Sequence, residues 1–327
     1  MSAAYEYSFI VPVYNAEKHL AECLDSLVNQ GERCEFVLVD DGSADSSGRI
    51  CDAYAESCEH VHVFHRPNGG PAAARNFGLE NAQGAYCIFV DSDDFISADF
   101  IERLEKTCGK DKADLIFYNI EKRFADGRSE PMAEGLKREQ ITGKTPEEVL
   151  AALAACGKFP ASTGGKIIKT ALLNENHIRF PDNLVGEDID WTLQLLYSMK
   201  SADVFAEGTY FYRIAPDSRR AFGREKSVAD QLTILENWLA KTENHPNRPY
   251  FLSFLAYQYA ICLPFYGALP SETKAAYTAR IKSLRFLLSY GKTRKIRLIR
   301  LAVKLFGIRA TSRLLYTYVV KRDETRD

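Results

Sequence analysis

A run of acidic residues, Asp91-Ser92-Asp93-Asp94, directly follows an apolar segment at 86–90. Three carboxylates this close repel one another unless a positive charge neutralises them. Mg²⁺ and Mn²⁺ prefer carboxylate oxygens and share their coordination with a substrate diphosphate. The run therefore predicts a divalent-cation site. The alternative is a solvated turn that caps the next helix, because Asp is also common at helix starts.

A second acidic cluster, Asp40-Asp41-Gly42-Ser43, follows another apolar segment at 36–39. A carboxylate in this position can accept a hydrogen bond from a nucleobase N–H or a ribose hydroxyl, as the acidic residue of dinucleotide-binding folds does. A capping turn is again the alternative. Two such clusters after successive parallel strands would face one crevice, which favours the binding interpretation for both.

Between the two clusters lies a glycine-containing segment, 68–76, with the sequence Asn-Gly-Gly-Pro-Ala-Ala-Ala-Arg-Asn. Its two glycines permit a close approach of the backbone, and Pro71 stands where a helix would begin. Arg75, one turn into that helix, can reach a phosphate or a base with its fork of donors. The alternative is a plain loop that carries a surface arginine.

The elements that must position these residues alternate between strand and helix. Short apolar runs at 8–13, 36–39, 61–64 and 86–90 predict strands, and the intervening segments, beginning with 16–30, have helical periodicity. Strands that are apolar throughout and separated by helices indicate a parallel sheet covered on both faces. Ligands bind beyond the carboxyl ends of the strands in such α/β folds, and both acidic clusters lie there.

The second half of the chain has a different organisation. We expect 121–139 to be a polar, mobile excursion, and beyond about residue 218 every pattern is helical. The sequence therefore predicts a catalytic α/β domain at 1–218 and a helical C-terminal region at 219–327.

One segment of the helical region, 249–271, contains 23 residues without a charge. That length meets the requirement for a membrane span. Gln258 and Pro264 lie within it, and its tyrosines are spread along it rather than gathered at its ends. These features favour a buried or interfacial helix over a span.

Composition excludes several classes of protein. With 46% hydrophobic and 26% charged residues, the chain is typical of soluble globular proteins rather than of disordered, collagenous or small disulfide-rich chains. No Cys-x-x-Cys pair and no zinc-type Cys and His spacing occurs among the eight cysteines. No signal peptide is visible, so we expect a cytoplasmic location.

Four segments resemble, in order and spacing, the motifs of glycosyltransferase family 2: Ser8 to Asn15, Val39 to Ser43, Gly70 to Gly78 and Val90 to Asp94. The resemblance is dense over roughly the first hundred residues and thin from there to about residue 215. Members of the family are inverting enzymes with the GT-A fold, a Rossmann-like, mostly parallel sheet with helices on both faces. A dinucleotide-binding dehydrogenase is disfavoured because no Gly-x-Gly-x-x-Gly follows the first strand.

The resemblance implies a role for each matching residue on the nucleotide side of the site. Pro12, Val13 and Tyr14 would line the nucleobase pocket. Asp41, or its neighbour Asp40, would bind the base or the ribose.

The same resemblance implies the residues around the diphosphate. Arg75 would help to hold the nucleotide, and Asn68 and Ser92 would be further nucleotide-sugar contacts. Asp91 would contact the ribose or the water shell of the metal. Asp93 would ligate the Mn²⁺ or Mg²⁺ that bridges the diphosphate.

Inversion also needs a base that deprotonates the acceptor hydroxyl from the opposite face of the sugar. The pair Glu187-Asp188 resembles the acceptor-side acidic motif of the family, so Asp188 is the predicted base and Glu187 would orient the acceptor or the base. The alternative is that both carboxylates only favour a helix N-terminus.

Four further basic positions resemble parts of the family pattern around the nucleotide sugar. Lys166 stands where relatives carry a lysine after a small residue. Arg213 is a candidate phosphate ligand in a segment that closes over the diphosphate, with Arg219 and Arg220 as weaker candidates. The alternative for each arginine is a solvated surface charge.

These features predict a metal-dependent, inverting glycosyltransferase of the hexosyltransferase class. It would move a sugar from a nucleotide-sugar, most often a UDP-sugar in this family, to a hydroxyl of a growing bacterial glycan such as capsule or O-antigen. A non-catalytic nucleotide-sugar-binding scaffold protein is one alternative, and a nucleotidyltransferase that uses the same acidic crevice is another.

The C-terminal region carries a strong positive charge. From residue 273 to residue 322 there are fourteen Lys or Arg and no Asp or Glu, although the net charge of the chain is −2. Within 294–309, apolar and basic residues fall on different helical faces, a pattern typical of helices that lie on anionic membranes. Because many members of the family act on lipid-linked saccharides, we expect contact with the cytoplasmic face of the inner membrane. The alternative is a packed helix with a solvated basic face, and no nucleic-acid-binding module is recognisable.

Overall fold

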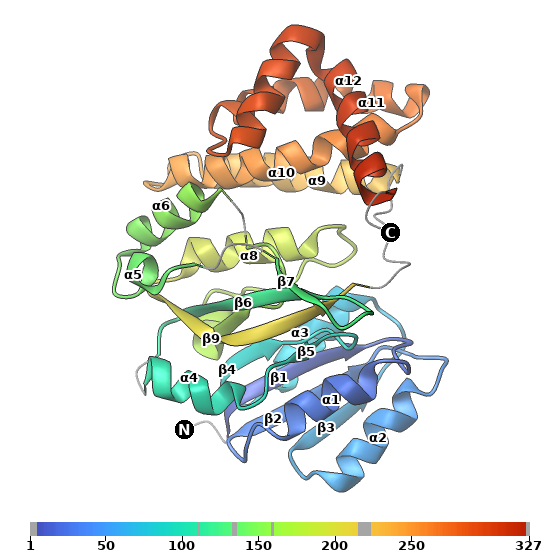
Figure 1. Ribbon diagram of the computed structural model, residues 1–327, viewed down its shortest axis with the longest axis vertical. Helices are drawn as coiled ribbons and strands as arrows, with labels where there is room; N and C mark the ends of the chain where they lie inside the picture. Colours follow the sequence, from blue (N-terminus) through green and yellow to red (C-terminus); the bar gives the residue numbers. More distant parts are fainter. Residues whose placement is uncertain (1–4, 110–111, 133–135, 158–159, 215–223, 325–327) are drawn as a thin grey trace. The chain divides into compact units, whose positions relative to one another are not determined.

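The computed structural model describes residues 5–109, 112–132, 136–157, 160–214 and 224–324 (Figure 1). The chain divides into two compact units: the first comprises 1–146, 161–183 and 187–215, and the second comprises 147–160, 184–186 and 216–327. The predicted domain boundary between residues 218 and 219 falls outside the described residues.

The first unit is built on one mixed sheet of nine strands in the described part of the chain. They are β1 (Tyr5–Val13), β2 (Cys34–Asp40), β3 (Val61–His65), β4 (Gly84–Phe89), β5 (Phe95–Ile96), β6 (Leu115–Arg123), β7 (Ser129–Pro131), β8 (Lys166–Lys169) and β9 (Ala202–Arg213).

The strand order is β3-β2-β1-β4-β8-β6-β9-β5, with β7 added at β6 (Figure 1). The four strands from β3 to β4 are parallel, which confirms the prediction from their apolar runs. Strand β8 is antiparallel to both β4 and β6, whereas β6 and β9 are parallel to each other. The carboxyl ends of β1, β2 and β4 therefore lie at one edge of the sheet.

The helices of the first unit are α1 (Leu20–Val28), α2 (Ser47–Ser57), α3 (Pro71–Asn81), α4 (Phe100–Cys108), α5 (Arg138–Ile141), α7 (Thr170–Glu175) and α8 (Glu187–Ser198). Successive side chains of a strand point to opposite faces of the sheet, and strands such as β2 are buried throughout. Both faces therefore need to be covered, and the helices cover them. Phe9 and Val11 of β1 share one core with Leu24 of α1. On the other face, Gly78 of α3 lies so close to Ile10 that a Cβ atom would be 2.5 Å from its side chain.

The first helix is shorter than the predicted 16–30, because the residues before Leu20 are held by another loop. Asn15 has a positive φ of 48°. Its N–H donates to Ser43 Oγ at 3.1 Å, and the N–H of Ala16 donates to Ser47 Oγ at 2.8 Å. The segment after β1 is thereby fastened to the loop that follows β2.

Within the expected polar excursion at 121–139, the structure contains a hairpin that the sequence did not predict. Strand β6 continues to Arg123, and β7 pairs with it in an antiparallel hairpin. All three residues of β7 are exposed, so the pairing depends on backbone hydrogen bonds and leaves no apolar pattern in the sequence.

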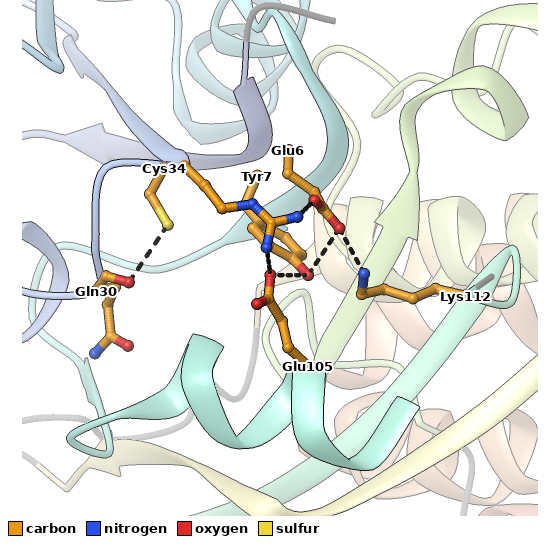
Figure 2. Close-up of polar contacts among 7 residues, drawn as sticks. Glu6, Tyr7, Gln30, Cys34, Glu105 and Lys112 are labelled. Carbon is orange, nitrogen blue, oxygen red and sulfur yellow. Dashed lines mark hydrogen bonds and ion pairs between the residues drawn. The ribbon is translucent and has the colours of Figure 1, made fainter. Parts of the chain in front are cut away.

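An ionic cluster joins the start of β1 to α4 (Figure 2). Arg33 pairs with Glu6 and donates to Glu105 at 2.5 Å, while the buried Lys112 donates to Glu6 at 2.5 Å. The hydroxyl of Tyr7 lies within 3.4 Å of both carboxylates. This cluster lies at the amino ends of the strands, so its role is to tie sheet and helix together.

The second unit is helical, as predicted. Its elements are α6 (Pro146–Cys156), α9 (Glu225–Lys241), α10 (Arg248–Ala268), α11 (Ser271–Ser283), the 3₁₀ helix η1 (Leu284–Ser289) and α12 (Arg294–Glu324). Within the described ranges, α10 alone is long and apolar enough to cross a membrane, and 72% of its apolar window is buried inside the protein. The hydroxyl of the buried Tyr259 donates to Ile281 O at 2.6 Å. These contacts make α10 the central core helix of this unit.

Candidate functional site

The carboxyl ends of β1 and β2 bring two predicted groups of site residues together. Val13 is in register with Asp40, and the N–H of Asp41 donates to Val13 O at 2.8 Å. Pro12 is half-buried and Val13 is buried, whereas Tyr14 is 54% exposed just beyond the strand. An exposed aromatic ring beside a carboxylate pair is suited to stacking against a flat base.

Asp41 holds the glycine loop that precedes α3. Its carboxylate accepts hydrogen bonds from the N–H groups of Gly69 and Gly70, at 3.0 and 2.7 Å. The Arg66 guanidinium lies 3.4 Å away. Gly70 has a φ of 87°, which favours glycine at this position, and Asn68 is exposed one residue before the loop. Asp41 therefore fixes the backbone of the segment predicted to approach the nucleotide.

Asp40 contacts the turn after β2 and the last residue of β3. Its carboxylate accepts the N–H of Ser43 at 3.1 Å and pairs with His65 at 2.9 Å. Burial alone would raise the pKa of Asp40, but the hydrogen bonds from Ser43 and His65 lower it below its ordinary value. The second ring nitrogen of His65 lies 3.0 Å from Asp52. These contacts order the turn after β2.

The acidic run after β4 contains one buried and two outward-facing carboxylates. Asp94 is 1% exposed, and burial raises its pKa to about 8. The Tyr210 hydroxyl donates to Asp94 at 2.6 Å, and the N–H of Arg213 donates to it at 2.8 Å. The same hydroxyl accepts the N–H of Asp91 at 3.1 Å. Asp94 therefore anchors the turn that presents Asp91 and Asp93.

Asp93 is a candidate metal ligand, because its carboxylate is accessible and lies close to the negative charge of Asp91. Its side chain is exposed, yet partial desolvation and the charge of Asp91 raise its pKa. Ser92 lies half-buried between the two. Among the described residues, no group of three or more His, Cys, Asp or Glu side chains could hold a metal ion. The described residues therefore offer Mn²⁺ or Mg²⁺ at most two carboxylates here, and further oxygen ligands would come from a diphosphate or water.

Arg75 joins the acidic run after β4 to the Glu187-Asp188 pair. The residue is 7% exposed, and its guanidinium donates to Asp91 at 2.7 Å and to Glu187 at 3.2 Å. The guanidinium also lies 5.4 Å from the centre of the Phe180 ring. Predicted from the sequence as a nucleotide-holding residue, Arg75 brings the first turn of α8 to the carboxyl end of β4.

The predicted base, Asp188, lies in the first turn of α8 beside a buried lysine. Burial and the charge of Glu187 raise the pKa of Asp188 to about 6. Lys166 is 1% exposed, donates to Ser162 O and lies 5.8 Å from the centre of the Trp191 ring. Burial lowers the pKa of Lys166 to about 7, although the charge of Asp188 opposes the shift. The two groups are therefore electrostatic neighbours.

Arg213 lies at the turn that carries the candidate metal ligands. Its Nε atom donates to Asp93 O at 2.9 Å, and Nη2 donates to Glu22 at 2.7 Å. This position is compatible with the predicted contact to a phosphate. The weaker candidates Arg219 and Arg220 lie outside the described residues.

Sequence reasoning missed two features of the site. Tyr210 lies 116 positions after Asp94 in an ordinary strand pattern, so nothing in the sequence marks its hydroxyl as the partner of that carboxylate. His19 precedes α1, where burial and the charge of Arg213 lower its pKa while Asp93 opposes the shift. The spacing of the histidines in the sequence did not point to His19, because the charged groups near it, Arg213 and Asp93, belong to other parts of the chain.

Comparisons with known proteins agree with this geometry. The family described as "Glycosyl transferase family 2" matches residues 8–163. Glycosyltransferase GlyG of Streptococcus pneumoniae is 33% identical over 216 residues, which cover 63% of this chain and 70% of GlyG. The poly(ribitol-phosphate) beta-glucosyltransferase of Bacillus spizizenii is 34% identical over 229 residues, which cover 68% of this chain and 33% of that enzyme.

The fold has a counterpart among solved structures. The crystal structure of Staphylococcus aureus TarS 1–349 in complex with UDP-GlcNAc superposes with a TM-score of 0.70 at 22% identity, over 97% of this chain and 92% of that one. This likeness confirms the predicted fold class, including the helical C-terminal region. The chain spans between 33% and 62% of the length of several curated relatives. By its ordered motifs and these matches, the chain belongs to glycosyltransferase family 2.

Proposed function

We propose that the chain transfers a sugar, with inversion, from a UDP-sugar to an acceptor hydroxyl on a bacterial cell-envelope polymer. The observation that carries this proposal is the Arg75 bridge, which joins Asp91 of the nucleotide side to Glu187 of the acceptor side. Inverting transfer needs these two kinds of group on opposite sides of one sugar. The names of the relatives support the substrate class: one glucosylates poly(ribitol-phosphate), and the TarS structure contains UDP-GlcNAc.

On the donor side, the chain supplies a platform for the nucleotide. The exposed Tyr14 ring would stack on the base, and the loop fixed by Asp41 would approach the ribose and the diphosphate. Asp93, with Asp91 beside it, would hold Mn²⁺ or Mg²⁺, which supplies positive charge opposite the departing diphosphate. Arg213 would add a second positive charge at the same turn.

On the acceptor side, Asp188 would take the proton from the attacking hydroxyl. A pKa of about 6 leaves its carboxylate ionised at neutral pH, yet makes it a stronger base than an ordinary Asp. Glu187, fixed by Arg75, would orient the acceptor. As the proton moves to Asp188, the acceptor oxygen attacks the anomeric carbon, and the bond to the nucleoside diphosphate breaks on the opposite face.

The acceptor would be a growing polymer of the envelope, lipid-linked in the course of its synthesis. The poly(ribitol-phosphate) in the name of the glucosyltransferase relative supports this acceptor class. We also place the reaction in the cytoplasm, and the eight free thiols of the chain are typical of a reducing compartment.

A turnover screen tests the proposal. The chain is incubated with UDP-, GDP- and dTDP-sugars, Mn²⁺ and envelope-polymer acceptors, and the released nucleoside diphosphate is measured. The proposal predicts acceptor-dependent release of UDP and a product of inverted anomeric configuration by NMR. Binding of UDP without turnover under every condition would favour a scaffold protein, and release of pyrophosphate from a nucleoside triphosphate would identify a nucleotidyltransferase.

A further inference from the structure

Exposed apolar side chains are concentrated on one helix of the second unit. Eleven large hydrophobic residues are exposed in the described part of the chain, and six of them lie on α12. These six are each more than half exposed: Leu298, Leu301, Leu305, Phe306, Leu314 and Tyr318. A helix of a soluble protein normally directs its apolar side chains to the core and leaves its outer face polar. Helix α12 departs from this pattern.

The inner face of α12 is already occupied. Ile296 and Ile299 are buried, at 3% and 5% exposure, and α12 packs on α10 and η1. Residues of an α-helix follow one another at about 100°, so Leu301 and Leu305 project away from this buried pair. The helix therefore has a second apolar face, which has no core to enter in the described part of the unit.

A backbone kink divides α12 into two segments. Gly307 has a φ of 76° and a ψ of 166°, and α12 consists of two helical segments that meet there at an angle (Figure 1). Leu301 and Leu305 lie before the kink, and Leu314 and Tyr318 lie after it with a spacing of four residues. Both segments thus carry an exposed apolar strip.

Basic residues flank the apolar strip. Arg297, Arg300 and Lys304 are exposed on α12 and make no ion pair within the described ranges. Helical geometry places them along one side of the face formed by Leu301 and Leu305. The surrounding segment, 273–322, contains fourteen Lys or Arg and no acidic residue. A partner that binds this face must therefore provide both an apolar region that can bury the leucines and a negatively charged surface.

We propose that the outer face of α12 docks on an anionic lipid bilayer. A helix in this position inserts its apolar strip at the boundary between headgroups and acyl chains, while its basic residues contact anionic headgroups. A second copy of the chain fits less well, because two surfaces with this charge would repel each other. A nucleic acid would satisfy the charge but not the exposed leucines. The docking is independent of the proposed sugar transfer.

Vesicle flotation of the full chain tests this surface. The vesicles contain either phosphatidylcholine alone or equal parts of phosphatidylcholine and phosphatidylglycerol. Two variants are compared with the wild type: Leu301→Ser/Leu305→Ser removes apolar area, and Arg297→Gln/Arg300→Gln/Lys304→Gln removes charge. Matched controls are Met132→Ser, and Lys144→Gln/Lys169→Gln/Lys200→Gln, which removes three exposed charges from elsewhere. Thermal unfolding by circular dichroism verifies that every variant is folded.

The proposal predicts that the wild type floats with the anionic vesicles only, and that salt weakens the binding. Each α12 variant should lose about tenfold or more of its partitioning, whereas both controls keep theirs. Equal flotation of wild type and α12 variants, or none for the wild type, would overturn the proposal. So would a dimer that the leucine variant dissociates without any change in flotation. Turnover with a soluble acceptor, measured in parallel, shows separately whether the transferase assignment holds.

Discussion

Glu187 accepts a hydrogen bond from Arg75, which precedes it by 112 positions in the chain, across 3.2 Å. The same guanidinium donates to Asp91 at 2.7 Å, so one buried cation neutralises an acid from each of two motifs. Removal of a partner from a buried ion pair leaves a charge without compensation. Arg75 therefore links the turn after β4 to the first turn of α8, and its loss should destabilise both.

A double-mutant cycle tests this coupling. Arg75→Met should lower the free energy of unfolding by about 3 kcal/mol, because Asp91 and Glu187 then repel each other. Combining it with Glu187→Gln should recover part of that loss, so the two changes are not additive. Chemical denaturation measures the cycle, with Arg103→Met at an exposed pair as the control that costs under about 1 kcal/mol. Strict additivity would show that the bridge contributes no coupling.

Asp188→Asn should abolish most of the turnover while leaving nucleotide binding intact. The amide keeps the size of the side chain but cannot accept the proton of the acceptor, and loss of a general base typically costs about 10²–10⁴-fold in rate. The measurement is kcat with a saturating donor, together with the Kd for UDP. Asp182→Asn, an exposed acid nearby in the sequence, serves as the control and should be neutral. Full activity in Asp188→Asn would assign the base to another group.

The pH dependence of kcat/KM should report the environment of Asp188. Its pKa is raised to about 6, so activity should fall as the pH drops below about 6 and the base becomes protonated. Glu187→Gln removes a charge that raises this pKa and should move the acid limb to lower pH. Lys166→Met removes a charge that lowers it and should move the limb to higher pH. Shifts of both variants in the same direction would disprove this assignment.

Much of the fold could be predicted from apolar patterns. The buried strands β1, β2 and β4 have runs such as Phe36 to Val39, whose side chains enter a core on both faces of the sheet. The exposed strand β7 gave no such signal, because its pairing with β6 uses backbone groups alone. Patterning identifies strands that are buried, and it fails where backbone hydrogen bonds decide the structure.

The candidate site could be predicted only where its residues are close in the sequence. The acidic runs that include Asp41 and Asp93 could be recognised because the residues of each run are contiguous in the sequence. The contacts of Arg75 with Glu187, and of Tyr210 with Asp94, depend on how distant elements pack. Such partners have no local signature, since only tertiary structure brings them together.

Tyr210→Phe should weaken both the fold and the proposed metal site. It leaves the buried carboxyl group of Asp94 without its hydroxyl donor, which costs about 1–3 kcal/mol. It also removes the acceptor of the Asp91 N–H, so the turn that presents Asp93 should loosen. Thermal unfolding and Mn²⁺-dependent UDP binding measure the two effects. Tyr290→Phe, at an exposed tyrosine, is the control, and an equally small effect of both changes would contradict the anchoring role.

The acidic run after β4 is proposed to bind a nucleoside diphosphate through a divalent cation. Calorimetric titration of UDP into the wild type and Asp93→Asn, with and without Mn²⁺, tests this proposal most directly. We predict binding that requires Mn²⁺ in the wild type and is lost in Asp93→Asn, with both proteins equally folded by circular dichroism. Metal-independent binding that is the same in both proteins, or no binding of UDP, GDP or dTDP to either, would contradict the claim.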